Sequence, residues 1–169
     1  RVFSQKCLAF CAEAAGMINA YGGVTVYAGG DDLLFIAPLN GTKREGKAEK
    51  EICLLELLRD LQKLFGRDEF FGGSEDSPTI SFGVAIRYYK YPMCESFDEA
   101  YNMLSRHAKE HRDAAAISLQ KHSGQSAKIV IQQFDKNEVT GHLIDLIGRH
   151  AEHQEQWLKS VSSKIWSFS

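Results

Sequence analysis

Two glycines and two aspartates between short apolar runs are the feature that most constrains the fold of this chain. Residues 24–28 are rich in β-branched and aromatic side chains, and residues 33–37 form a second apolar run. Between them stands Gly29-Gly30-Asp31-Asp32, a combination of residue types typical of tight turns. The pattern predicts a β-hairpin that carries both aspartates at its tip.

The segments on either side predict helices that alternate with further strands. Apolar residues recur at helical spacing over residues 2–21 and again over residues 48–65. Strands are expected over residues 79–89, 114–119 and 127–131, where β-branched and other apolar residues gather. This mixed order favours an α+β fold, in which helices cover one face of an antiparallel or mixed sheet.

The connecting segments divide the chain further. Residues 66–78 are expected to be a loop, because glycine, proline and charged residues dominate them. A helix is expected to begin at Ser96, since Glu99 three residues later completes a capping-box pattern. Helical periodicity returns near the C-terminus, so we expect a domain over residues 1–133 followed by a helical segment over residues 134–169.

Charge and hydropathy exclude several classes of protein. The 169 residues include 20 Lys+Arg and 22 Asp+Glu, with a pI of about 6.3, whereas a bulk nucleic-acid binder usually has a pI above roughly 9. No apolar run approaches the roughly 18 residues of a membrane span, and no signal peptide is visible. We therefore expect a cytoplasmic protein without a membrane partner. The cysteines form no CxxC pair and are expected to be reduced, mostly buried thiols: Cys7, Cys11, Cys53 and Cys94.

The paired aspartates suggest a metal site. Adjacent carboxylates repel each other, and this costs free energy unless a cation lies between them. Mg²⁺ suits the position, because it takes one or two carboxylates and completes its coordination with water and substrate phosphates. Gly29 and Gly30 lack side chains, so a nucleotide could approach their backbone closely. The competing interpretation is an ordinary polar turn, in which Asp31 and Asp32 have no chemical role.

The order of motifs around the hairpin resembles a known superfamily. The sequence TISFGVA follows at residues 79–85, and Ala108-Lys109 stands on a later helix. This order resembles palm-type nucleotidyl cyclases and polymerases, of which the GGDEF diguanylate cyclases are members. The form YAGGDD, with KHSG at residues 121–124, is similar to the second palm of the large subunit of type III CRISPR effector complexes. The resemblance covers residues 1–131 and implies a ferredoxin-like palm, with the helical tail opening a C-terminal helical domain.

The resemblance also implies a reaction. In that family ATP is joined into cyclic oligoadenylate, with metal ions (Mg²⁺ or Mn²⁺) activating a 3′-hydroxyl for attack on an α-phosphate. Asp31 and Asp32 carry over as metal ligands, and Gly29 and Gly30 as the backbone that admits the nucleotide. Ser81 carries over as a base or ribose contact, and Lys109 as a point charge on the triphosphate. The implied partners are the other subunits of a type III CRISPR complex, and guide and target RNA through that complex.

Departures from the pattern leave two alternatives open. Asp32-Leu33 stands where GGDEF enzymes have Glu-Phe, which disfavours a diguanylate cyclase acting on GTP. A non-catalytic palm that serves as an assembly module is the other alternative. The family's first palm strand, with its own aspartate, would precede residue 1. We therefore expect the chain by itself to bind ATP weakly and to be inactive.

Two further pairs of residues allow a functional and a structural interpretation. His107 and His111 are spaced to share one helix face, where they could bind zinc or simply face solvent. Phe70 and Phe71 stand in the loop over residues 66–78, where they could form a partner surface or fold inward.

Overall fold

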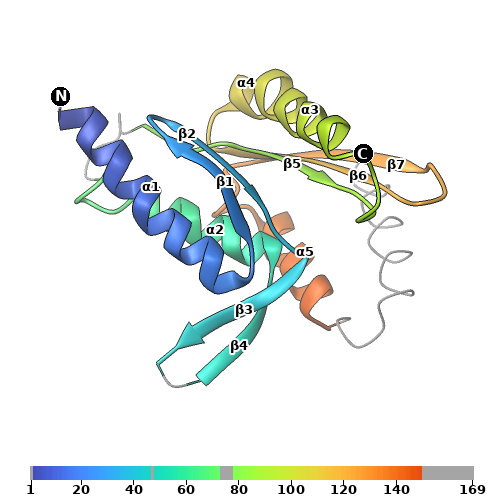
Figure 1. The fold of residues 1–169 in the computed structure, drawn as a ribbon, viewed down its shortest axis with the longest axis horizontal. Helices are drawn as coiled ribbons and strands as arrows, with labels where there is room; N and C mark the ends of the chain where they lie inside the picture. The colour runs from blue at the N-terminus through green and yellow to red at the C-terminus, as the bar shows by residue number, and fades with distance from the viewer. Residues whose placement is uncertain (1, 47, 73–77, 150–169) are drawn as a thin grey trace. The chain divides into compact units, whose positions relative to one another are not determined.

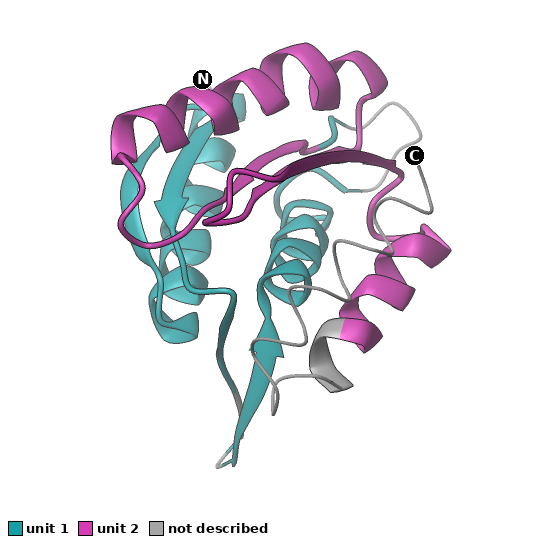
Figure 2. Ribbon diagram, turned by 90° about the vertical axis from the view of Figure 1, so that its right-hand side faces the viewer, with its two compact units in different colours: residues 1–79 teal, residues 80–169 magenta. Residues whose placement is uncertain are grey.

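The computed structural model describes residues 2–46, 48–72 and 78–149. The chain divides into two compact units, residues 1–79 and residues 80–169, which Figure 2 shows in separate colours. Each unit has its own helices and its own strands.

The first unit begins with the predicted helix and hairpin. Helix α1 (Val2–Tyr21) is followed directly by strands β1 (Val24–Gly29) and β2 (Asp32–Ile36), which pair antiparallel (Figure 1). Gly22, with a φ of +101°, ends the helix in the left-handed conformation that glycine adopts readily. The buried face of α1 has the expected helical spacing: Cys7, Phe10, Cys11, Ala14, Ile18 and Tyr21.

A second hairpin stands where the sequence predicted the start of a helix. Strands β3 (Asn40–Glu45) and β4 (Ala48–Cys53) pair antiparallel, and helix α2 begins only at Leu54 and ends at Phe65. The prediction of a helix over residues 48–65 was therefore wrong in its first six residues. Pairing with β3 overrides the helix propensity of the Ala, Glu and Lys residues there. The leucine residues whose helical spacing indicated this helix all lie in α2.

The loop after α2 turns its aromatic residues inward. Phe70 and Phe71 are both buried, and the ring of Phe71 stacks on Phe65 at a centroid distance of 4.4 Å. The ring of Phe10, from α1, meets Phe65 edge-on at 5.0 Å. These contacts close the core of the first unit, so the interpretation of the two phenylalanines as a partner surface is wrong.

The second unit is built on a mixed sheet. Strand β5 (Phe82–Ile86) pairs parallel with β6 (Ala114–Gln120), and β6 pairs antiparallel with β7 (Ser126–Gln132). The strand expected over residues 79–89 is shorter than predicted, because only its central part pairs with β6.

Helix α3 (Met93–Met103) packs on this sheet and is extended by the π-helical segment η1 (Leu104–Ala108) and by α4 (Lys109–His111) (Figure 1). The helix begins three residues before the predicted start at Ser96. Pro92 is its N-cap residue and carries a φ of −55°, which suits entry into a helix.

Helices cover both faces of the three-stranded sheet. Ala114 and Ala116 face the cluster that contains Met103 of α3, whereas Leu119 packs against Leu146 of α5 (Glu138–Arg149). The prediction that helices cover one face was therefore wrong for this sheet. Its central strand β6 is buried along nearly its whole length, which requires cover on both sides.

The structure confirms an α+β fold. Within the described ranges, none of the helices combines the length and apolar character that crossing a membrane requires. The predicted C-terminal helix is present as α5, and residues 150–169 lie outside the described part of the chain. The division into residues 1–133 and 134–169 stays a prediction.

Candidate functional site

The hairpin tip is a loop of only two residues. Gly29, the last residue of β1, pairs directly with Asp32, the first residue of β2, so Gly30 and Asp31 alone make the turn. Gly30 has a φ of +62° at the first position of the loop, where a two-residue type II′ turn has glycine. The short loop holds the backbone around both aspartates in a defined geometry, and both side chains are exposed.

The two carboxylates are available to a ligand. Among the described residues, no side chain forms a hydrogen bond or an ion pair with Asp31 or Asp32. Nor do the described residues contain a cluster of three or more His, Cys, Asp or Glu side chains that could hold a metal ion. The described residues of the first unit thus supply two neighbouring carboxylates at the tip. This donor set fits Mg²⁺, which commonly takes one or two protein carboxylates and fills its remaining positions with water and phosphate oxygens.

Two cysteines of α1 lie behind the tip. The Cys11 thiol donates a weak hydrogen bond to the Gly30 carbonyl oxygen at 3.9 Å, so α1 contacts the turn itself. Burial raises the pKa of both the Cys7 and the Cys11 thiol, and the negative charge of Asp31 adds to the effect at Cys7. Both thiols are therefore neutral near neutral pH and add no negative charge beside the aspartates. Helical spacing predicted these cysteines as core residues, but it held no signal for the contact with Gly30.

Tyr27 is a further residue at the tip. A side chain at Gly29 would stand 3.0 Å from the Tyr27 hydroxyl oxygen, so glycine at this position leaves room for the tyrosine. The strand pairing shifts register between Thr25 and Tyr27, and the Tyr27 side chain is exposed. Sequence reasoning gave Tyr27 no role, because a register shift in a short strand leaves no pattern in the sequence.

The other predicted site residues lie in the second unit. Ser81 is half-buried directly before β5, and Lys109 is exposed at the start of α4, after the π-helical segment. Gly29, Gly30, Asp31 and Asp32 stand together in the first unit. The roles of Ser81 and Lys109 as nucleotide contacts stay predictions.

Gly83, which belongs to the TISFGVA sequence, has a structural role. A β-carbon on Gly83 would collide with the Ala100 carbonyl oxygen and with the backbone nitrogen of Leu104. Glycine here allows the backbone of α3 to pack directly on β5.

The two histidines differ in exposure, since His107 is half-buried. His111 is exposed, and its Nδ1 atom lies 3.1 Å from the Gln132 side-chain nitrogen. No third metal ligand joins His107 and His111 within the part of the chain that the structure describes.

Comparison with known proteins agrees with this arrangement. Residues 1–117 match the family described as Cas10/Cmr2, second palm domain. The CRISPR system Cmr subunit Cmr2 of Pyrococcus furiosus is 34% identical over 104 residues, which is 60% of this chain and 11% of that protein. The chain thus spans about a ninth of the length of this relative. With its α+β fold and its exposed GGDD hairpin, the chain belongs to the Cas10/Cmr2 second palm domain family and is a palm domain of the type III CRISPR large subunit.

Proposed function

We propose that this chain is the palm of a nucleotidyltransferase that joins ATP into cyclic oligoadenylate within an RNA-guided CRISPR antiviral complex. The observation that carries the proposal is the two-residue tip, which presents two exposed carboxylates without a protein partner among the described residues. Without a cation these charges repel each other, which favours a metal-binding role over an ordinary polar turn.

In this proposal the aspartates and the glycines at the tip have different roles. Asp31 and Asp32 hold divalent ions, Mg²⁺ or Mn²⁺, through their carboxylate oxygens. Bound ions of this kind stabilise the attacking 3′-oxygen and the leaving pyrophosphate. Gly29 is half-buried and Gly30 is exposed, and the absence of side chains at both lets the phosphates lie close to the turn.

Two residues of the second unit are further proposed nucleotide contacts. Ser81 contacts the base or the ribose, and the Lys109 ammonium group contacts the triphosphate as a point charge. In the reaction, a bond forms between the 3′-oxygen of one ATP and the α-phosphorus of another. The bond from that phosphorus to pyrophosphate breaks, and the hydroxyl proton passes to solvent.

The proposed partners follow from the relative's name. Cmr2 of Pyrococcus furiosus is a subunit of a CRISPR system. We place this chain in the same context, in contact with the other subunits of a type III complex and, through them, with guide and target RNA in the cytoplasm.

A non-catalytic assembly module is the second candidate. The observation that favours it is the absence of a third metal-ligating side chain near Asp31 and Asp32 among the described residues. A diguanylate cyclase acting on GTP is less well supported, because Asp32 replaces the glutamate of that family and because the matching family is Cas10/Cmr2.

Product analysis of the full-length protein in its RNA-loaded complex separates these candidates. The complex is incubated with ATP or GTP, Mg²⁺ and target RNA, and the products are identified by mass spectrometry. The test variant is Asp31→Asn with Asp32→Asn, and Asp98→Asn is the matched control, because Asp98 is an exposed aspartate of α3. The proposal predicts cyclic oligoadenylate from the wild type and from the control, and none from the double variant. A complex that assembles but yields no product would support the assembly module, and a cyclic dinucleotide from GTP would support the diguanylate cyclase.

A further inference from the structure

A tight turn after β5 presents aromatic side chains to solvent. The Tyr91 amide donates to the Tyr88 carbonyl oxygen at 2.8 Å and closes the turn over residues 88–91, here called the tyrosine turn. Tyr88 is 39% exposed and Tyr89 is 79% exposed, and their ring centroids lie 4.6 Å apart. Exposed tyrosines grouped in this way are a common sign of a binding surface.

The tip of the next hairpin joins this surface. His122 lies in the loop between β6 and β7, and its ring meets Tyr88 edge-on at a centroid distance of 4.8 Å. The Lys121 amide donates to the Gln125 carbonyl oxygen at 2.8 Å, so this loop is also held in a defined turn. Two loops separated in sequence thus present one aromatic surface.

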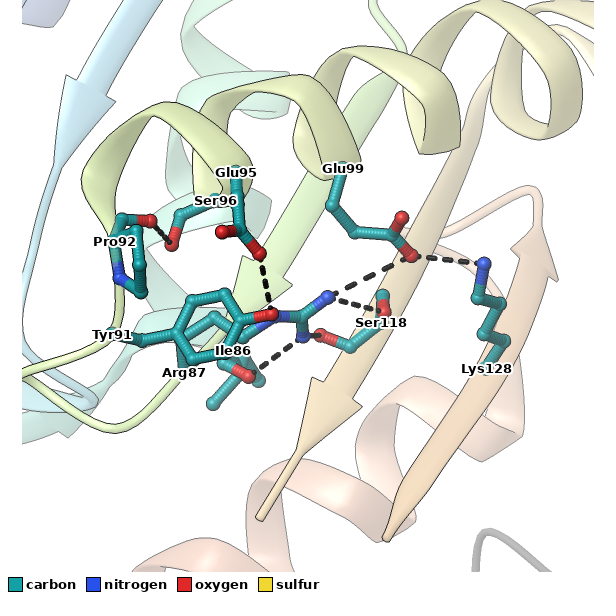
Figure 3. Close-up of polar contacts among 9 residues, drawn as sticks. All are labelled: Ile86, Arg87, Tyr91, Pro92, Glu95, Ser96, Glu99, Ser118 and Lys128. Atoms are coloured by element: carbon teal, nitrogen blue, oxygen red, sulfur yellow. Dashed lines mark hydrogen bonds and ion pairs between the residues drawn. The ribbon is translucent and has the colours of Figure 1, made fainter. Parts of the chain in front are cut away.

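The largely buried Arg87 side chain lies beside Tyr91, the last residue of the tyrosine turn, as Figure 3 shows. The Arg87 guanidinium donates to the carbonyl oxygens of Ile86 and Ser118, both at 3.0 Å, and to the Ser118 hydroxyl at 3.1 Å. Its carbon centre lies 5.9 Å from the centroid of the Tyr91 ring. The Tyr91 hydroxyl lies 2.8 Å from a Glu95 carboxylate oxygen of α3. These contacts hold both ends of the turn, and a turn that is already ordered reduces the entropy that binding would cost.

Two lysines, Lys90 and Lys121, carry positive charge in the tyrosine turn and in the neighbouring loop. Lys90 lies over the Tyr89 ring, with its ammonium nitrogen 5.4 Å from the centroid. In the described ranges, neither Lys90 nor Lys121 forms an ion pair. Of the acids beside the turn, Glu99 is paired with Arg87 and Lys128. Glu95 accepts a hydrogen bond from the Tyr91 hydroxyl group and keeps its negative charge.

We propose that the tyrosine turn and the loop over residues 121–125 bind a single strand of nucleic acid. Nucleobases stack on exposed aromatic rings regardless of sequence, and nearby lysines attract the phosphates. The surface is small, which agrees with the near-neutral charge of the chain. The inference goes beyond the proposed function, because it uses no residue of the GGDD hairpin.

Fluorescence anisotropy of a labelled short RNA oligonucleotide, titrated with the 169-residue chain, tests this surface. Tyr89→Ala is expected to weaken binding about tenfold, whereas Tyr89→Phe keeps the ring and most of the affinity. The matched control is Tyr101→Ala, since Tyr101 is 70% exposed on α3 and lies outside the tyrosine turn. Thermal unfolding by circular dichroism checks that each variant is folded.

Salt dependence tests the lysines separately. Two phosphate contacts predict a slope of about −1.4 in a plot of log K against log salt, since each contact to a single strand contributes roughly −0.7. The double change Lys90→Gln and Lys121→Gln is expected to remove most of this slope. Lys136→Gln, at another exposed lysine, is expected to leave it unchanged.

Three results would overturn the inference: equal binding by the wild type and Tyr89→Ala, equal competition by duplex RNA, or no binding by the folded chain. The tyrosine turn would then be assigned to a protein interface. The variant Asp31→Asn with Asp32→Asn is expected to bind RNA as the wild type does. Failure of this inference is thereby distinguished from failure of the proposed function.

Discussion

At the scale of single residues, the cysteines behind the hairpin tip illustrate how burial controls chemistry. Cys7, Cys11 and Cys53 are buried free thiols, and Cys94 is exposed. Burial raises the pKa of the Cys53 thiol to about 11, and it raises the pKa of the thiols of Cys7 and Cys11 as well. Because the thiolate is the reactive form, burial protects these three sulfurs both by excluding reagents and by keeping them protonated.

Thiol labelling measures this protection. At about pH 8, a disulfide reagent is expected to label Cys94 rapidly and the three buried cysteines only after unfolding in guanidinium. The variant Cys94→Ser is the control and should abolish the rapid phase. Rapid labelling of a second cysteine in the native chain would show that the core around that cysteine is open to the reagent.

Glu99 shows how a single carboxylate links stability to pH. Its side chain lies 2.9 Å from the Lys128 ammonium nitrogen and 3.7 Å from a guanidinium nitrogen of buried Arg87. Hydrogen bonds from Lys128 and Ser118 hold the pKa of Glu99 below its ordinary value of 4.5. A lowered pKa in the folded state means that Glu99 stabilises the fold above about pH 4.5, and that this contribution is lost as the pH falls through the folded value.

Glu99→Gln is expected to lower the free energy of unfolding by about 1–3 kcal/mol at neutral pH. The difference from the wild type should shrink below about pH 4.5, because the wild-type carboxylate then becomes protonated as well. Urea unfolding at a series of pH values measures this, with Glu110→Gln, an exposed residue of α4, as the control. A difference that stayed constant down to low pH would contradict the assigned role of the charge.

At the scale of elements, the packing of α3 on β5 depends on Gly83. A β-carbon there would collide with backbone atoms of Ala100 and Leu104, which cannot move without displacing the helix. Gly83→Ala is therefore expected to cost about 1–3 kcal/mol of stability through overpacking. Thermal unfolding measures the loss. Gly141→Ala, in α5, is the control, because its β-carbon would have no neighbour within 4 Å. Equal melting temperatures for both variants would show that α3 does not press on β5.

The elements also show which parts of the fold the sequence could predict. The first hairpin was predictable, since apolar strands flank a turn whose residue types fit a two-residue loop. The strand β4 was not predictable, because its sequence AEKEIC suits a helix and becomes a strand only by pairing with β3. The start of α3 was missed because Pro92 begins the helix before the apparent capping box at Ser96.

At the scale of the whole molecule, the sequence located the candidate site but not its extent. The order of the motifs along the chain was enough to identify the GGDD tip and the family, because this order does not depend on how the chain packs. The tertiary contacts of individual side chains were not predictable from the order of the motifs. The contact of Cys11 with Gly30 and the hydrogen bond from Arg87 to Ser118 both join residues far apart in sequence.

The central claim is that Asp31 and Asp32 hold a divalent cation at the hairpin tip. The most direct test adds small amounts of Mn²⁺ to the ¹⁵N-labelled chain and records which amide signals broaden first. We expect the signals of Gly30, Asp31 and Asp32 to broaden before the others in the wild type and in Asp98→Asn. In Asp31→Asn with Asp32→Asn, this selective broadening should disappear. Broadening centred elsewhere, or unchanged at the tip of the double variant, would contradict the account.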